Sequence, residues 1–198
     1  PAEGSLGAQS PSVIRQIKQF AALRLRVSAI QRPDGTLLIA REDAGAAYVD
    51  GRSSPLRLNV QHAATEMRSA HVCTVSRRPD HYRILVHHLA SGSPFSGLYT
   101  FGGNPALADL ALGGYDAVFQ PDASSIGDSQ LIWDWLPGGH IFLRAGGCIL
   151  ALDGSPLDVV GAAERSINRG DGHYPYVAAH TPQLAARIVD WLASHSQP

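Results

Sequence analysis

The sequence predicts a layered α/β domain, and three features support this fold class. Strand-length apolar runs alternate with helical patterns through the second half of the chain, which is typical of helices packed on a sheet. Closely spaced strand-length runs joined by turns occupy much of the first half. The 198 residues are 44% hydrophobic, which is enough to bury one core. We therefore predict one domain over residues 1–198 and expect the Gly-, Ser- and Pro-rich start, residues 1–11, to be flexible.

The first half predicts a helix followed by short strands. Apolar residues recur at helical spacing after Ser12, which predicts a helix to residue 22. Apolar and polar residues then alternate from Leu23 to Ala29, as in a half-buried strand. The turn residues Arg32–Thr36 lead from there into the apolar run Leu37–Ala40, so the two runs predict a hairpin. Two further short strands are predicted, Ala44–Val49 and Leu56–Val60.

The second half predicts strands and helices in alternation. Apolar runs of strand length occur at His71–Val75, Leu98–Phe101, Tyr115–Phe119 and Cys148–Leu152. Helical spacing, bounded by proline at a start or glycine at an end, occurs at Pro79–Leu89, Ala106–Leu112, Leu136–Ala145 and Gln183–Ser194. Pro137 fits the third of these helices only in its first turn, because proline has no N–H to donate.

Composition and charge exclude several classes of partner. The formal net charge is −1 and the sequence pI is near 6.9, so no basic field attracts nucleic acid or an anionic membrane. The apolar runs are far shorter than the roughly 20 residues that span a bilayer, and the first four residues show no signal pattern. The cysteines, Cys73 and Cys148, lie far apart and form no metal-binding motif. We expect free thiols, with a disulfide as the alternative, and a soluble cytoplasmic protein.

Five separated sequence elements occur in a fixed order: Gly102–Leu107, Ala111–Val118, Trp133-Asp134, Ala145–Gly147 and Leu152–Leu157. This order resembles the inositol monophosphatase family. That family typically shows a Gly-Ser-Ala-Ala-Leu segment, an Ala-x-Gly-x-x-Asp-Ala strand, a Trp-Asp helix start, a Glu-Ala-Gly-Gly helix end and an Asp-x-x-Gly turn. Extended more weakly over residues 23–192, the resemblance is to the C-terminal two-thirds of such a protein.

The resemblance implies a Mg²⁺-dependent phosphatase built from stacked helix and sheet layers, the sandwich type of the inositol monophosphatases and sugar phosphatases. Hard Mg²⁺ takes oxygen ligands, and paired metals stabilise the attacking and leaving oxygens. On this resemblance Asp134 is a metal ligand and Trp133 a packing residue, while Gly102, Gly103 and Asn104 form a loop that approaches the substrate. The residues alone leave alternatives open. Asp134 could be a helix N-cap, and the two glycines could form an ordinary turn.

Most of the acids that such an enzyme needs are not found. The family's Glu-Glu and Asp-Pro-x-Asp-Gly-Thr motifs have no counterpart, and Arg32–Thr36 is better interpreted as a turn. Arg144 stands where the family has Glu before Ala-Gly-Gly. Asp122 and Asp128 are weaker candidates for a second acid, and Asp116 is interpreted as structural. The nine histidines form no metal or triad motif, so surface positions are expected for them.

Two functions follow as hypotheses. The first is Mg²⁺-dependent hydrolysis of a small phosphate monoester, such as an inositol phosphate, a sugar phosphate or a 3'(2')-phosphonucleotide. The alternative is a degenerate, non-catalytic relative that serves as a binding or oligomerisation module. In either case an incomplete sheet needs covering, so we expect a homodimer or a partner chain. A segment missing from this sequence would restore a complete enzyme.

Overall fold

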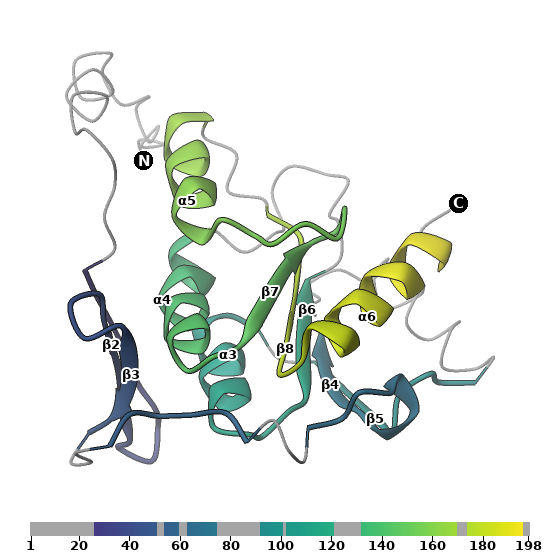
Figure 1. Ribbon diagram of the computed structural model, residues 1–198, viewed down its shortest axis with the longest axis horizontal. Coiled ribbons are helices and arrows are strands. Elements are labelled where there is room, and N and C mark those ends of the chain that lie inside the picture. The colour runs from purple at the N-terminus through teal and green to yellow at the C-terminus, as the bar shows by residue number, and fades with distance from the viewer. Residues whose placement is uncertain are drawn as a thin grey trace, which may run out of the picture.

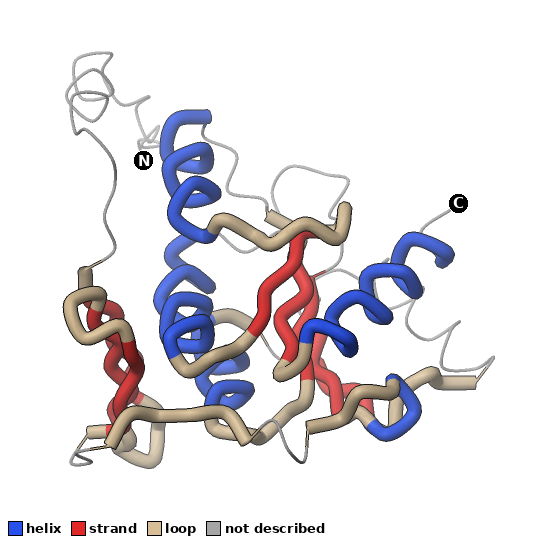
Figure 2. The backbone as a smooth tube through the Cα atoms, in the orientation of Figure 1, coloured by secondary structure: helices blue, strands red, loops and turns tan. Residues whose placement is uncertain are grey.

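The computed structural model describes residues 26–50, 54–59, 63–74, 92–100, 102–120, 132–169 and 174–195. Figure 1 shows the order of the layers: a small sheet, a group of helices, a larger sheet and one further helix. Figure 2 shows the same separation of helices from strands. The layered α/β prediction is therefore confirmed. The predicted helices at 12–22 and 79–89, and the start at 1–11, lie outside the described residues.

The small sheet has three antiparallel strands in the order β1-β2-β3. They are β1 (Val27–Gln31), β2 (Leu37–Arg41) and β3 (Ala46–Val49). Alternate residues face inward and are buried, among them Ile30, Leu38 and Ala40, because successive side chains of a strand point to opposite faces. The predicted hairpin is confirmed. Leu56, by contrast, makes only a single bridge with Ala47, so the strand predicted to start there is wrong over its described residues.

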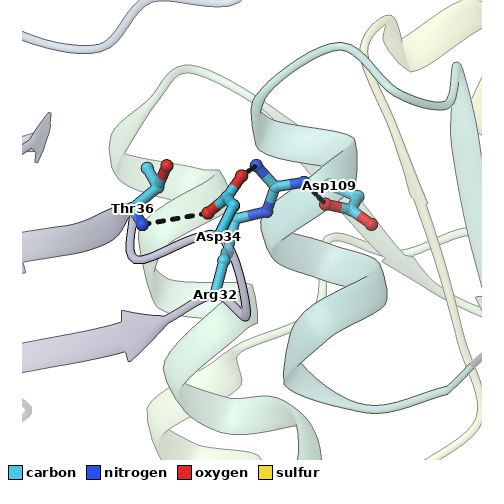
Figure 3. Close-up of polar contacts among 4 residues, drawn as sticks. All are labelled: Arg32, Asp34, Thr36 and Asp109. Atoms are coloured by element: carbon cyan, nitrogen blue, oxygen red, sulfur yellow. Dashed lines mark hydrogen bonds and ion pairs between the residues drawn. The ribbon is translucent and has the colours of Figure 1, made fainter.

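The turn of this hairpin has a stable hydrogen-bonding pattern of its own. Asp34 Oδ1 accepts a hydrogen bond from the Thr36 N–H at 2.9 Å, and this bond is the largest cause that lowers the pKa of the Asp34 carboxyl. Arg32 donates to Asp34 Oδ2 at 2.8 Å and also pairs with Asp109 at 2.9 Å (Figure 3). Gly35 has φ +86°, which favours glycine. Arg32–Thr36 is therefore a turn, as predicted, and not a metal-binding motif. The ion pair with Asp109 anchors this turn to the helix that contains Asp109.

The larger sheet has five strands in the order β5-β4-β6-β8-β7. Its strands are β4 (His71–Thr74), β5 (Gly97–Thr100), β6 (Ala117–Gln120), β7 (Cys148–Ala151) and β8 (Tyr176–Ala179). Strands β5, β4 and β6 are parallel, whereas β8 runs antiparallel to both of its neighbours. The carboxyl ends of β4, β5 and β6 consequently meet at one edge of the sheet.

Four α-helices are described: α3 (Asn104–Ala111), α4 (Ile132–Arg144), α5 (Val159–Arg169) and α6 (Pro182–His195). A short 3₁₀ helix, Met67–Ser69, precedes β4. Helices α3 and α4 lie between the two sheets, and α6 covers the far face of the larger sheet (Figure 1). Two cores result, one on each face of that sheet. None of the described helices is long and apolar enough to cross a membrane.

Two details of the chain bear on the predictions. Cys73 is buried and Cys148 half-buried, and both are thiols outside any disulfide, as expected. Helix α4 begins at Ile132, four residues before the predicted start at Leu136. Pro137 therefore lies inside the helix instead of in its first turn, and the prediction for its position is wrong. The structure supplies the missing hydrogen bond from another helix, as described below.

Candidate functional site

The candidate site lies where α3 and α4 begin. Helix α3 starts at Asn104, shortly after β5 ends, and α4 follows β6 along the chain. The side chain of Asn104 reaches the main chain of α4 at Trp133, so the two helix starts adjoin. Open α/β sheets bind their ligands outside the carboxyl ends of the strands. The corner where α3 and α4 begin is therefore the candidate ligand site of this fold.

Asn104 joins the two helices through both ends of its carboxamide. Its Nδ2 donates to the carbonyl oxygen of Trp133 at 2.8 Å, and its Oδ1 accepts from the N–H of Gly138 at 2.8 Å. In a regular helix, residue 137 would donate its N–H to the Trp133 carbonyl oxygen, but Pro137 has no N–H to donate. The Asn104 side chain supplies that hydrogen bond instead, which makes a proline inside α4 acceptable. The side chain of Asn104 is thus directed toward α4.

The glycines at this corner have steric reasons to be glycine. Gly103 caps α3 with φ 78°, a backbone region that side chains disfavour. Its carbonyl oxygen accepts from Ala106 N–H at 3.1 Å. Gly138 faces α3 so closely that a Cβ there would lie 2.7 Å from Leu107 Cβ. These contacts support the turn interpretation of Gly102 and Gly103, and they leave the main chain of that turn as the part that a ligand could approach.

Asp134 is the third residue of α4 and lies in its first turn. It is therefore not an N-cap, and that alternative is wrong. Its side chain is half-buried, and the positive end of the helix dipole favours a negative charge in this turn. The neighbouring Trp133 is 63% exposed, so the prediction that it is a packing residue is also wrong. Trp135, which is fully buried, packs there instead.

Buried polar groups lie on α4 beside Asp134 in the sequence and on the strands of the larger sheet, and the sequence prediction missed them. Within the described ranges, the side-chain atoms Thr74 Oγ1, Gln120 Oε1, Trp135 Nε1 and Tyr176 OH are buried without a hydrogen-bond partner. Gln120 and Tyr176 face each other across β6 and β8, and the rings of Trp135 and Tyr176 are 5.3 Å apart. Burial raises the pKa of Tyr176, which keeps its hydroxyl neutral.

Leaving such groups unpaired costs roughly 1–3 kcal/mol each, so their presence asks for an explanation. Thr74 and Gln120 are the last residues of β4 and β6, at the carboxyl edge where ligands bind in such sheets. A polar residue that ends an apolar strand run was the available signal for Gln120 in the sequence. For Tyr176 no signal was available, because β8 itself was not predicted.

Other candidate residues are structural or lie outside the described residues. Asp116 accepts hydrogen bonds from the main-chain N–H groups of His71 at 2.8 Å and Ala64 at 3.3 Å, which confirms the structural interpretation. Arg144 donates to His140 Nε2 at 3.2 Å, at the far end of α4 from Asp134. Asp122 and Asp128 are not among the described residues.

The histidine prediction is wrong at two positions. His140 and His180 are 6% and 7% exposed. The ring of His140 also contacts Ser28 Oγ at 2.9 Å, and the ring of His180 reaches the carbonyl oxygen of Leu110 at 2.7 Å. Each histidine therefore links one layer of the fold to another.

The described residues do not complete a magnesium site by themselves. Among them, no group of three or more His, Cys, Asp or Glu side chains could hold a metal ion. Asp134 supplies one carboxylate at the corner, whereas Mg²⁺ requires near-octahedral oxygen coordination. Further ligands would have to come from outside the described residues, so no reaction step can be assigned to a metal here.

Comparison with known proteins gives a clear answer at the level of structure only. No family profile matches the sequence, and no curated protein sequence matches it. Among solved structures, the Bartonella henselae suppressor protein suhB is 18% identical, with a TM-score of 0.60 over 85% of this chain. The Thermotoga maritima IMPase is 14% identical, with a TM-score of 0.61 over 86% of this chain. The fold is that of the inositol monophosphatases.

This match confirms the predicted fold. An inositol monophosphatase from Anabaena (Nostoc) is 19% identical over 85% of this chain, with a TM-score of 0.60. The matched region is 57% of the suhB and Thermotoga chains and 60% of the Anabaena chain. The chain therefore spans somewhat more than half the length of these proteins.

Proposed function

We propose that this chain catalyses the Mg²⁺-dependent hydrolysis of a small phosphate monoester, such as an inositol phosphate, a sugar phosphate or a 3'(2')-phosphonucleotide. The observation that carries the proposal is that Asp134 lies in the first turn of α4, which Asn104 joins to the start of α3, in a chain with an inositol monophosphatase fold. Solved structures of staphylococcal IMPase-II contain inositol monophosphate or 2'AMP. Their TM-scores with this chain are 0.57 and 0.55. Phosphate monoesters are thus ligands of proteins with this fold.

The residues of this chain would divide the work at the corner. Asp134 would hold a divalent cation together with acids from outside the described residues, and that cation would activate the phosphate ester. The main chain at Gly102 and Gly103 would approach the non-phosphate part of the substrate. Gln120 would offer a neutral hydrogen-bonding group to its hydroxyls. Two cysteines that form no disulfide accord with a reducing, cytoplasmic location, which we include in the proposal.

The test is phosphate release by the purified chain from inositol, sugar and nucleotide monophosphates, with and without Mg²⁺. Asp134→Ala is the informative variant, and Asp190→Ala is a matched control because Asp190 is exposed on α6, on the other side of the larger sheet. We expect Mg²⁺-dependent release that Asp134→Ala abolishes and Asp190→Ala preserves. Release that survives Asp134→Ala would contradict the assignment of the metal ligand.

A second function has one specific observation in its favour. The outward face of the small sheet is largely apolar, with Val27 60% exposed, Ala29 exposed, and Ile39 and Tyr48 half-buried. Ala29, Ile39 and Tyr48 lie side by side across the three strands. No described element covers this face (Figure 1). An exposed apolar face of this kind is typical of an interaction surface, so we propose a binding or oligomerisation module as the alternative.

This alternative is tested by the state of association. A chain that dimerises or captures a partner through the small sheet should sediment as a larger species, and Ile39→Lys should return it to the monomer while the circular dichroism spectrum stays unchanged. Gln183→Lys, at an exposed position on α6, is the control for added charge. A wild-type chain that is monomeric at all concentrations, with full phosphatase activity, would exclude the module.

A further inference from the structure

Helix α4 contains a proline in a position that should weaken it. Pro137 is the sixth residue of the helix and has no N–H, so it cannot donate to the carbonyl oxygen of Trp133, four residues earlier. The proline ring also crowds that carbonyl. The defect falls in the part of α4 that carries Trp133 and Asp134. Without compensation, the first turn of the helix would have an unsatisfied acceptor and freedom to fray.

Asn104 compensates for this defect from the neighbouring helix. Its Nδ2 donates to the Trp133 carbonyl oxygen at 2.8 Å, and its Oδ1 accepts from Gly138 N–H at 2.8 Å. The two bonds fix the orientation of the amide, because the reverse orientation would place donor against donor and acceptor against acceptor. The Asn104 side chain therefore forms hydrogen bonds with the α4 main chain both before and after Pro137.

We propose that Asn104 is a positioning residue: it replaces the helix hydrogen bond that Pro137 removes and thereby sets where Asp134 lies relative to the turn at Gly102 and Gly103. The resemblance had assigned Asn104 to the substrate. The geometry directs its carboxamide to α4 instead. The effect on binding rests on the proposed function. The hydrogen-bond replacement itself does not.

The test is a double-mutant cycle. Pro137→Ala restores an N–H that can donate to the Trp133 carbonyl oxygen, so Asn104→Ala should cost much less in that background. In the wild-type background we expect Asn104→Ala to lower the ratio of folded to unfolded protein about tenfold. In the Pro137→Ala background the loss should be about threefold or less. Asn104→Asp keeps an acceptor for Gly138 N–H but replaces the donor with a carboxylate oxygen that repels the Trp133 carbonyl oxygen, so Pro137→Ala should rescue this variant only in part.

Two further readouts separate positioning from general stability. The amide resonances of residues 133–136 and of Gly138 should move in Asn104→Ala under fully folding conditions and return toward their original positions when Pro137→Ala is added. The affinity for inositol monophosphate in the presence of Mg²⁺ should fall about tenfold in Asn104→Ala and recover in the double variant. Equal losses from Asn104→Ala in both backgrounds, with no recovery of the resonances, would overturn the proposal.

The outcomes also distinguish this proposal from the proposed function. If the wild-type chain binds no phosphate ester, the proposed function fails, but the stability cycle and the amide resonances still decide whether Asn104 replaces the lost hydrogen bond. If the ligand binds and its affinity is the same in Asn104→Ala as in the wild type, Asn104 does not position Asp134 and the proposal is wrong, while the proposed function stands.

Discussion

Two adjacent glycines of α4 give a sharp prediction about how closely α3 and α4 pack. A Cβ at Gly138 would lie 2.7 Å from Leu107 Cβ, 3.1 Å from the Asn104 carbonyl oxygen and 3.3 Å from Asn104 Cα. Carbon atoms in good contact are about 3.5–4.0 Å apart, and two of these three neighbours are backbone atoms that cannot turn aside. A Cβ at Gly139 would have its nearest neighbour, Trp135 Cε3, at 3.4 Å, which is ordinary contact.

Both substitutions to alanine gain the same helix propensity, about 1 kcal/mol. Gly138→Ala must also overpack the α3–α4 interface, which costs typically about 1–3 kcal/mol. The difference between the two variants therefore isolates the clash. We expect Gly139→Ala to match or exceed the wild type in the free energy of unfolding, and Gly138→Ala to fall about 1–3 kcal/mol below Gly139→Ala. Urea denaturation followed by circular dichroism measures both. Equal stability of the two variants would refute the close approach of the helices.

Three other predictions concern the remaining contacts. Burial, and to a smaller extent the nearby Arg144 guanidinium, lowers the pKa of His140, so this residue binds a proton more readily in the unfolded chain than in the folded one. The free energy of unfolding should therefore fall as the pH drops from about 6.5. Urea titrations of His140→Gln should show less of this loss. Arg32→Ala should lower the free energy of unfolding by about 0.5–1 kcal/mol, because Arg32 pairs with Asp109 at 2.9 Å in a partly buried position. Arg41→Ala should have no measurable effect, because its ion pair with Asp43 is exposed. Equal effects of the two substitutions would contradict the anchoring of the hairpin to α3. Tyr176→Phe removes a buried hydroxyl that has no partner within the described ranges, so calorimetry should show unchanged or greater stability, by up to about 1 kcal/mol. A clear loss of stability would mean that the hydroxyl has a structural partner.

The sequence was sufficient to predict the β1–β2 hairpin and helix α6, because the patterns that specify them lie within short segments of the chain. The hairpin between β1 and β2 followed from two strand-length runs around Asp34-Gly35, and the structure contains it. Helix α6 followed from an apolar stripe, which the structure buries at Leu184, Ile188 and Leu192. In both cases the signal lies within about a dozen residues.

The parts that were missed depend on tertiary contacts. Strand β8 is fully buried between β6 and β7, and its four residues carry no alternating pattern. The true start of α4 could not be predicted, because Pro137 argues against a helix interior and only Asn104, 33 residues earlier in the chain, makes it acceptable. Helix α5 also went unpredicted.

The candidate site divides in the same way. Asp134 and the glycine turn were found through their order along the chain. Gln120, Trp135 and Tyr176 become visible as a group only when β6, α4 and β8 are assembled, since the feature that marks them is burial without a hydrogen-bond partner. Exposure of Trp133 is also a tertiary property, because a large aromatic residue in an apolar sequence ordinarily packs in a core.

The most direct test of the proposed site is to locate the ligand by NMR. Inositol monophosphate and Mg²⁺ are titrated into the isotope-labelled 198-residue chain and into Asp134→Ala. We expect the amide resonances that move in the wild type to cluster at residues 102–104, 106, 132–136 and 138 and at Gln120. We expect Asp134→Ala to abolish these shifts. Shifts that cluster elsewhere, or that persist unchanged in Asp134→Ala, would contradict a phosphate-ester site at the corner where α3 and α4 begin.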